Sequence, residues 1–303
     1  MADLRRTVTA LFGEQGEAWL RDLPRRVAER EALWSIRTSP PFTGLSYSFV
    51  APGKAADGTV IVLKLAPPGI AVRHEIAALR HFAGRGAVRL LADDADAGAL
   101  LLERAVPGDP LSTLWEEEAA MSAAAAVMRK VWRPAPPVHD FPSVSDWGRG
   151  FERLRRAFGG GVGPFPVGLV DRAERLFGEL AASMAEPVVL HGDLHHANIL
   201  SSEREPWLAI DPKGVIGEPA YEVGAVLRNP MPVLLADPDL AARQRRRIDV
   251  LAAELGFDRE RIAGWAFAQA VLAARWAFED DGAGWEGWLA CAVGLADAMG
   301  WRR

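Results

Sequence analysis

The sequence predicts an α+β fold in two parts. A small, strand-rich N-terminal part with a leading helix is expected over residues 1–104, and a larger, mainly helical part over 105–303. Before residue 104, short segments rich in β-branched residues are separated by Gly and Asp turn residues. The segment VPGDPL, residues 106–111, then interrupts the chain, and long stretches with helical spacing follow it.

The N-terminal part reads as a helix followed by a strand meander. In the first thirty residues, apolar positions recur between charged ones at helical spacing. The breaker PPG then precedes a further helical pattern. Strands are expected at residues 33–39, 46–52, 59–66, 88–94 and 98–105, and a helix at 70–82.

The C-terminal part contains helical patterns and one polar stretch. Helices are expected at residues 114–131, 151–158, 170–184 and from 241 to the end, with breaks at GFD and DDGAG. Between them, VVLHGDLHHANIL (188–200) places polar residues within apolar flanks. Buried polar groups cost free energy unless they are used, so this stretch is the first candidate for a functional site.

Composition excludes several classes of function. Of 303 residues, half are hydrophobic, a quarter are charged, and the net charge is −5, which does not suggest nucleic-acid binding. The Arg243–Arg247 run is best explained as a solvated helix face, and the single Cys291 excludes an intrachain disulfide. The N-terminus lacks the apolar core of a signal peptide, and no apolar run reaches the roughly 18 residues of a membrane span. We therefore expect a cytoplasmic protein, monomeric or weakly dimeric.

The spacing H-x-D-x-x-x-x-N joins His191, Asp193 and Asn198, and Asp211 follows at the end of the apolar segment WLAI. A hairpin around the turn SSEREP would bring these residues to one end. Asn198 and Asp211 offer the oxygen ligands that Mg²⁺ prefers, and Asp193 is then free to orient a hydroxyl and accept its proton. This division of labour is that of kinase-type phosphoryl transfer.

HGDLHHANIL resembles the catalytic loop of the aminoglycoside phosphotransferase family of small-molecule kinases, and AIDPKGVIGEPAYEVG resembles its metal-binding segment. The second segment is especially similar to the streptomycin 6-phosphotransferase and hydroxyurea phosphotransferase branch. The resemblance covers most of the chain from about Trp34 onward. It implies a two-lobed, protein-kinase-like fold with ATP and Mg²⁺ between the lobes.

The remaining kinase roles can be assigned by position. Lys64 is the only lysine on an expected strand, and Glu75 is the only carboxylate on the helix that follows, so this pair is expected to hold the ATP phosphates. Ser46 and Ser48 are candidates for phosphate contacts in a short loop. Adenine is expected to contact the main chain of Glu103 and Ala105.

Two other classes of function are considered. His195 and His196 suggest the metal cluster of a metal-dependent hydrolase. That hypothesis leaves Asn198, Asp211 and Lys64 without a role. A catalytically silent nucleotide-binding module is disfavoured because the base, metal ligands and phosphate lysine are all present.

The acceptor is a small hydroxylated molecule, and carboxylates on the helical part favour a cationic one. The candidate substrate residues are Glu218, Glu222, Trp276, Glu279 and Asp280, with Asp281 beside them. Trp276, Glu279 and Asp280 share a helix face at spacings of three and four residues. The predicted activity is transfer of the γ-phosphoryl of ATP to streptomycin or a related aminoglycoside. The alternative acceptor is hydroxyurea or another hydroxylated metabolite.

Overall fold

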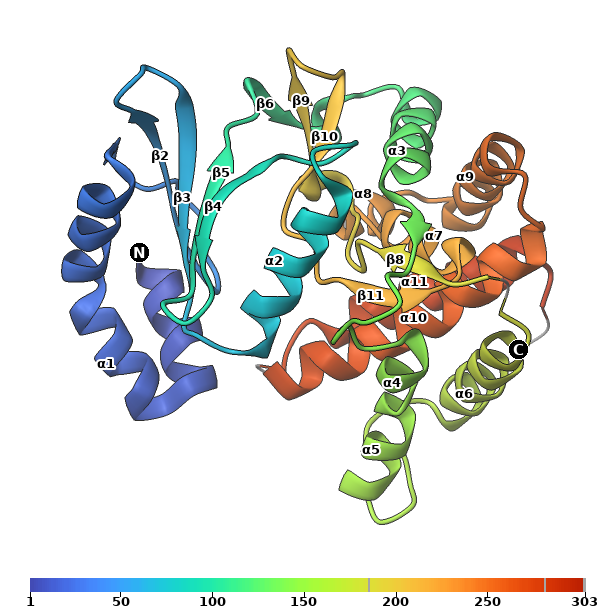
Figure 1. Cartoon of the computed structure of the whole chain (residues 1–303). Coiled ribbons are helices and arrows are strands. Elements are labelled where there is room, and N and C mark those ends of the chain that lie inside the picture. Colours follow the sequence, from blue (N-terminus) through green and yellow to red (C-terminus); the bar gives the residue numbers. More distant parts are fainter. Residues whose placement is uncertain (185, 281, 302–303) are drawn as a thin grey trace.

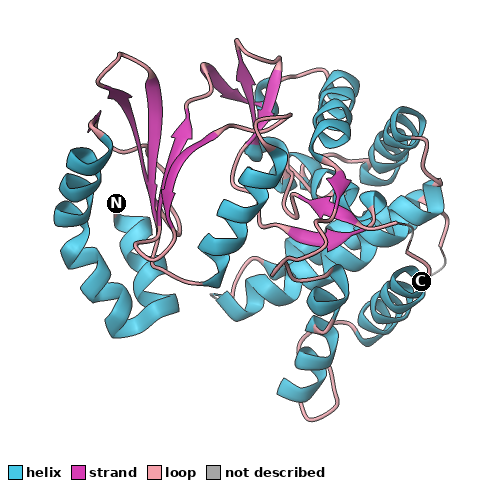
Figure 2. Cartoon of the chain, viewed as in Figure 1, coloured by secondary structure: helices cyan, strands magenta, loops and turns pink. Residues whose placement is uncertain are grey.

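A computed structural model describes residues 1–184, 186–280 and 282–301. A strand-rich lobe lies on one side of the molecule and a mainly helical lobe on the other (Figures 1 and 2). Among the described residues, no helix combines the length and apolar character needed to cross a bilayer. The expected order of elements is confirmed, with ends that differ by a few residues.

The N-terminal lobe is built on one antiparallel sheet of order β1-β2-β3-β5-β4. Its elements are α1 (Ala2–Trp34), β1 (Ile36–Thr38), β2 (Phe49–Ala55), β3 (Val60–Leu65), α2 (Ile70–Phe82), β4 (Leu90–Asp94) and β5 (Ala99–Glu103). Helix α1 bends at Gly13, whose φ of 53° lies in the left-handed region.

The two faces of this sheet pack on different helices. Because side chains alternate along a strand, Ile61, Leu63 and Leu65 of β3 face the core that includes Leu4 and Trp19 of α1. The intervening positions of β3 point to the opposite face, where α2 packs. Lys64 therefore emerges on the α2 side, toward the rest of the chain.

The C-terminal lobe consists of helices around two small sheets, of order β10-β9-β6 and β11-β8-β7. Its strands are β6 (Pro107–Pro110), β7 (Arg133–Pro134), β8 (Val188–Leu190), β9 (Ile199–Ser202), β10 (Trp207–Ala209) and β11 (Val215–Gly217). Its α-helices are α3 (Glu117–Val131), α4 (Val144–Gly148), α5 (Gly150–Ala157), α6 (Val167–Ala182), α7 (Pro219–Leu227), α8 (Met231–Leu235), α9 (Leu240–Leu255), α10 (Arg259–Asp280) and α11 (Trp285–Ala298). The 3₁₀ turns are η1 (Leu111–Thr113) and η2 (His196–Asn198).

The core of this lobe surrounds α10, which contributes the fully buried Trp265 and Phe267. The boundary expected after residue 104 falls between β5, which belongs to the first sheet, and β6, which pairs with β9. Its position as a domain boundary stays a prediction.

Candidate active site

Two loops form the site, and strand pairing places them side by side. The chain leaves β8 at Leu190, forms the first loop and enters β9, which pairs with β10 as the expected hairpin. After β10 a second loop leads into β11, which pairs back onto β8. The main chain joins the loops directly, because Lys213 N–H donates to the carbonyl of His191 at 2.7 Å and Ile210 N–H to that of Asn198 at 2.9 Å.

Asp193 lies in the first loop with a side chain that is 28% exposed. Its Oδ1 is 3.3 Å from Nη2 of the buried Arg228, and its Oδ2 is 3.7 Å from Nε2 of His195. The Arg228 guanidinium also donates to Oε1 of Gln269 at 2.8 Å. Asp193 is thus held from inside the lobe while part of its side chain stays exposed to solvent.

His191 and Glu222 support this loop from beneath. The two oxygens of the buried Glu222 accept from the N–H groups of His191, at 2.6 Å, and Gly192, at 2.9 Å. Burial raises the pKa of Glu222 to about 7 despite these hydrogen bonds. His191 Nε2 lies 2.7 Å from the carbonyl of Ile210, so this nitrogen is the donor, and Nδ1 accepts from Asp193 N–H. Burial lowers the pKa of His191 to about 4, which keeps the ring neutral.

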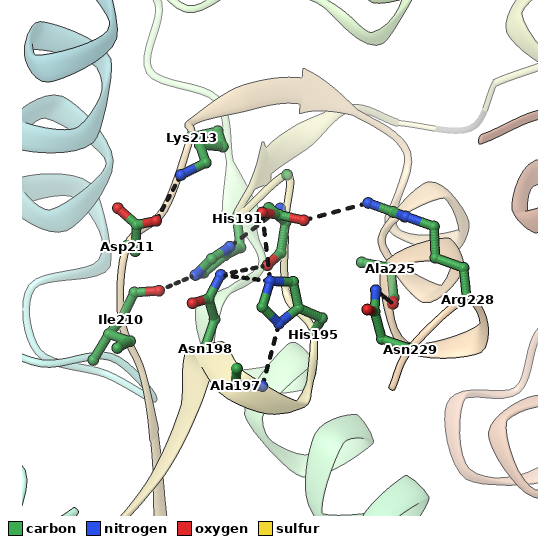
Figure 3. A network of polar contacts seen from close by, with 12 residues as sticks. His191, His195, Ala197, Asn198, Ile210, Asp211, Lys213, Ala225, Arg228 and Asn229 are labelled. Carbon is green, nitrogen blue, oxygen red and sulfur yellow. Dashed lines mark hydrogen bonds and ion pairs between the residues drawn. The ribbon is translucent and has the colours of Figure 1, made fainter. Parts of the chain in front are cut away.

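Asn198 and Asp211 present oxygen ligands at the junction of the two loops. Asn198 uses its amide nitrogen to donate to the Asp193 carbonyl at 2.9 Å, which turns its amide oxygen away from that contact (Figure 3). Asp211 has a φ of 59°, an uncommon conformation for a residue other than glycine and one that often marks a functional site. One amide and one carboxylate suit Mg²⁺, which keeps water and phosphate as its other ligands.

Lys64 joins the N-terminal lobe to this junction. Its Nζ is 2.8 Å from both oxygens of Glu75 on α2 and 2.5 Å from Oδ1 of Asp211. Burial alone would lower the pKa of the Lys64 ammonium, but the two carboxylates outweigh burial and raise it above its ordinary value. Burial opposes ionisation of Asp211 as well, yet Lys64 and Lys213 hold the pKa of this carboxyl well below its usual range. A cation is thereby held where the lobes meet.

The candidate nucleotide contacts of the N-terminal lobe lie in the loop before β2 and at the end of β5. Ser46 is exposed and Ser48 is half-buried in the loop between β1 and β2. Glu103 ends β5, and its N–H already donates to the carbonyl of Arg89 at 2.9 Å. Its carboxylate binds Arg204 at 2.7 and 2.9 Å, so this side chain ties the link between the lobes to the β9–β10 turn. Ala105 is buried just beyond it.

Two of the predicted substrate carboxylates, Glu218 and Glu222, are buried inside the C-terminal lobe. Glu218 is 2% exposed and is paired with Arg261 at 2.7 Å, so its charge is already neutralised inside the lobe. Glu222 is 1% exposed and is committed to the first loop, as described above. Neither can reach an acceptor without leaving a buried cation or N–H group unpaired.

The other predicted substrate residues lie near the end of α10. Trp276 is half-buried and packs edge to face on Trp147 of α4, with ring centroids 6.1 Å apart. Glu279 is half-exposed and forms an ion pair with Arg275. The side chain of Asp280 and all of Asp281 lie outside the described residues.

The two histidines of the metal-dependent hydrolase hypothesis have other partners in the structure. His196 is buried, and its Nε2 faces Nη2 of Arg247 at 3.3 Å rather than His195. Burial, and then Arg247, lower the pKa of His196 to about 3. His195 Nδ1 accepts from Ala197 N–H and so caps the 3₁₀ turn. Among the described residues, no group of three or more His, Cys, Asp and Glu side chains is arranged to hold a metal ion.

Sequence reasoning missed three residues beside the loops. Arg228 contacts Asp193 from the end of α7, 35 residues away in the chain. Lys213 contacts Asp211, and only its closeness to that residue in DPKG gave a signal. Trp147 lies against Gly192, where a Cβ would stand 2.8 Å from its ring. Arg228 and Trp147 carry no sequence signal, because tertiary packing alone brings them to the loop.

The site combines an aspartate suited to accept a proton, an Asn–Asp pair suited to hold Mg²⁺, and a buried Lys–Glu pair. This combination between two lobes is that of a kinase-type phosphotransferase. The comparisons agree. A sequence model described as aminoglycoside/hydroxyurea antibiotic resistance kinase matches residues 34–282. The chain belongs to this family, and it is an enzyme that phosphorylates hydroxyl groups. The expected resemblance is thereby confirmed.

Individual relatives support the assignment over most of the chain. Streptomycin 6-kinase of Streptomyces glaucescens is 35% identical over 95% of this chain and 92% of its own. Hydroxyurea phosphotransferase of Kitasatospora aureofaciens is 35% identical over 88% of this chain and 77% of its own. An aminoglycoside phosphotransferase, solved in a ternary complex with ADP and hygromycin B, matches with a TM-score of 0.60 at 16% identity. That match covers 88% of this chain and 97% of the other, and it confirms the expected two-lobed kinase-like fold.

Proposed function

We propose that this enzyme transfers the γ-phosphoryl group of ATP to a hydroxyl of streptomycin or a related aminoglycoside. The observation that carries the proposal is the position of Asp193 beside Asn198 and across the loop junction from Asp211 and Lys64. A proton acceptor, oxygen ligands and a phosphate-binding cation are thereby available in one place. Phosphoryl transfer depends mainly on such positioning and charge.

The residues have separate tasks in this reaction. Asp193 accepts a hydrogen bond from the acceptor hydroxyl and takes its proton as the hydroxyl oxygen bonds to phosphorus. Asn198 and Asp211 would hold Mg²⁺, which supplies positive charge to the phosphate oxygens. Lys64, oriented by Glu75, binds the phosphates of ATP. Ser46, Ser48 and the main chain of Glu103 and Ala105 remain candidate nucleotide contacts.

The acceptor is inferred from the relatives and from local charge. The identity to streptomycin 6-kinase extends across almost the whole chain. The second candidate acceptor is hydroxyurea, because the hydroxyurea phosphotransferase is equally identical over a shorter span. Trp276 and Glu279 would flank an acceptor that enters beside Trp147. We expect the enzyme to act as a monomer or weak dimer.

A substrate panel tests the proposal. The purified enzyme is incubated with ATP and Mg²⁺ and with streptomycin, hydroxyurea, a 2-deoxystreptamine aminoglycoside or choline. The products are identified by mass. Streptomycin is expected to gain one phosphate. A phosphorylated hydroxyurea with unmodified streptomycin would select the second candidate, and no phosphorylated product from any acceptor would reject the proposed acceptors.

A further inference from the structure

Lys213 is a cation beside the proposed metal ligand Asp211, and the roles above do not use it. Its Nζ is 2.6 Å from Oδ2 of Asp211 (Figure 3). Lys64 contacts Oδ1 of the same carboxylate. Both oxygens of Asp211 therefore contact an ammonium group. A divalent cation that binds Asp211 is repelled by both ammonium groups, which favours displacement of the one that is held less firmly.

The two lysines differ in how firmly they are held. The Lys64 side chain is 9% exposed, and Glu75 provides it with a second carboxylate. The Lys213 side chain is 43% exposed, and it forms an ion pair with Asp211. Desolvated, doubly paired charges are costly to separate, while half-exposed pairs contribute about 0–1 kcal/mol. Lys213 is therefore the ammonium that a divalent cation would displace from Asp211.

The main chain keeps Lys213 close to the reaction after its side chain has moved. Its N–H donates to the carbonyl of His191 at 2.7 Å. A Cβ added to Gly192 would stand 3.3 Å from the Lys213 Cβ, so the two residues are close neighbours. Gly192 directly precedes Asp193. Gly214, with a φ of 64°, allows the chain to turn away immediately after Lys213. The side chain thus starts from a fixed point beside the residue that precedes the base.

We propose that Lys213 is a further catalytic residue, whose ammonium exchanges Asp211 for the transferred phosphoryl group when metal and nucleotide bind. The inference rests on the proposed function. In the reaction, the acceptor oxygen bonds to the γ-phosphorus, the bond to the β–γ bridging oxygen breaks, and the hydroxyl proton passes to Asp193. Lys213 neither gains nor loses a proton. It contacts the equatorial oxygens, where negative charge is concentrated in the transition state.

The exchange makes two separate predictions for Lys213→Met. Loss of a transition-state cation is expected to lower kcat on the order of 100-fold, with the acceptor KM changed less than about threefold. Loss of the competing ammonium is expected to lower, by several-fold, the Mg²⁺ concentration that gives half-maximal ADP binding. The second effect can be measured without turnover, by calorimetry or by the change in tryptophan fluorescence.

Lys130→Met is the matched control, because Lys130 is 45% exposed and forms a 2.8 Å ion pair with Glu205. It is expected to leave both measurements unchanged. Lys213→Arg keeps the charge and should retain at least about tenfold more activity than Lys213→Met. Thermal unfolding of each variant checks that it is folded.

The outcomes separate this inference from the proposed function. An unchanged Mg²⁺ requirement in folded Lys213→Met, or a kcat within about threefold of the wild-type value, overturns the role of Lys213. If the wild-type enzyme phosphorylates no acceptor, the proposed function fails. The Mg²⁺ titration then still decides whether Lys213 and the metal compete for Asp211.

Discussion

Lys64 and Asp211 are 147 residues apart in the chain, yet Lys64 Nζ lies 2.5 Å from Asp211 Oδ1. This contact joins β3 of the N-terminal lobe to the loop that follows β10. Glu75 holds the same ammonium from α2 at 2.8 Å. The proposed phosphate-binding cation and the proposed metal ligand are therefore aligned by one network, which lowers the cost of assembling the site.

Kinetics should distinguish Lys64, which is paired with Glu75, from an exposed lysine nearby. Lys64→Ala is expected to raise the KM for ATP and lower kcat, because the ammonium contacts phosphates in both ground and transition states. Lys54→Ala, on the exposed part of β2, should change neither. Steady-state kinetics with varied ATP provides the comparison. Equal effects from both substitutions would show that Lys64 has no special role.

The same pair makes a stability prediction. Lys64→Met leaves Glu75 buried without its cation and should cost about 3–5 kcal/mol of unfolding free energy. Adding Glu75→Leu should recover most of that loss without restoring activity, because both buried charges are then gone. Urea unfolding of the single and double variants measures this. A double variant no more stable than Lys64→Met would show that the loss does not come from the unpaired charge of Glu75.

Asp193→Asn tests the base. The change keeps size and removes the carboxylate, so kcat should fall by about 10²- to 10⁴-fold while ADP binding stays intact. Asp96→Asn is the control, since Asp96 is an exposed surface carboxylate paired with Arg73. Near-wild-type turnover by Asp193→Asn would show that Asp193 is not the base.

Asn198→Ala and Asp211→Ala test the metal ligands. Each removes one oxygen ligand and should weaken Mg²⁺-dependent nucleotide binding and activity. Activity of the wild type should be lost with excess chelator and return with Mg²⁺ or Mn²⁺. Full activity in chelator, or dependence on tightly bound zinc, would contradict the assignment.

His191 predicts how stability depends on pH. Its folded-state pKa of about 4 lies below the unfolded value near 6.5, so the unfolded chain binds the proton first as pH falls. The stabilisation is complete above pH 6.5 and is lost between there and about pH 4, by up to roughly 3 kcal/mol. His191→Gln should flatten the unfolding free energy over this window. An unchanged slope would show that other groups cause it.

Glu279 forms an ion pair with Arg275, so its charge is already partly neutralised. Glu279→Gln is therefore expected to change the KM for streptomycin by less than about tenfold, or roughly 1.4 kcal/mol. The KM for ATP should not move. A larger rise in the streptomycin KM that shrinks at high salt would show that Glu279 binds the cationic acceptor directly.

Sequence patterns predicted the helices and strands well, because apolar spacing and turn residues act over a few neighbouring positions. Helix α2 spans the expected residues, and the hairpin that presents Asn198 and Asp211 forms where the turn SSEREP indicated. The strand parity of Lys64 follows from its alternation with Ile61 and Leu63.

Local patterns do not encode burial or tertiary partners. Glu218 and Glu222 are carboxylates of a type common on surfaces, but packing of α7 under the first loop buries them against Arg261 and main-chain N–H groups. Arg228 reaches Asp193 only because α7 ends beside the loop. Neither relationship has a fixed sequence spacing.

The most direct test of the central claim follows the phosphoryl group. Wild type and Asp193→Asn are each incubated with streptomycin, Mg²⁺ and ATP labelled in its γ-phosphate, and the products are analysed by ³¹P NMR and mass spectrometry. The account predicts labelled streptomycin monophosphate and equimolar ADP from the wild type, and almost none from Asp193→Asn. Equal product from both enzymes, or label released only as free phosphate, would contradict it.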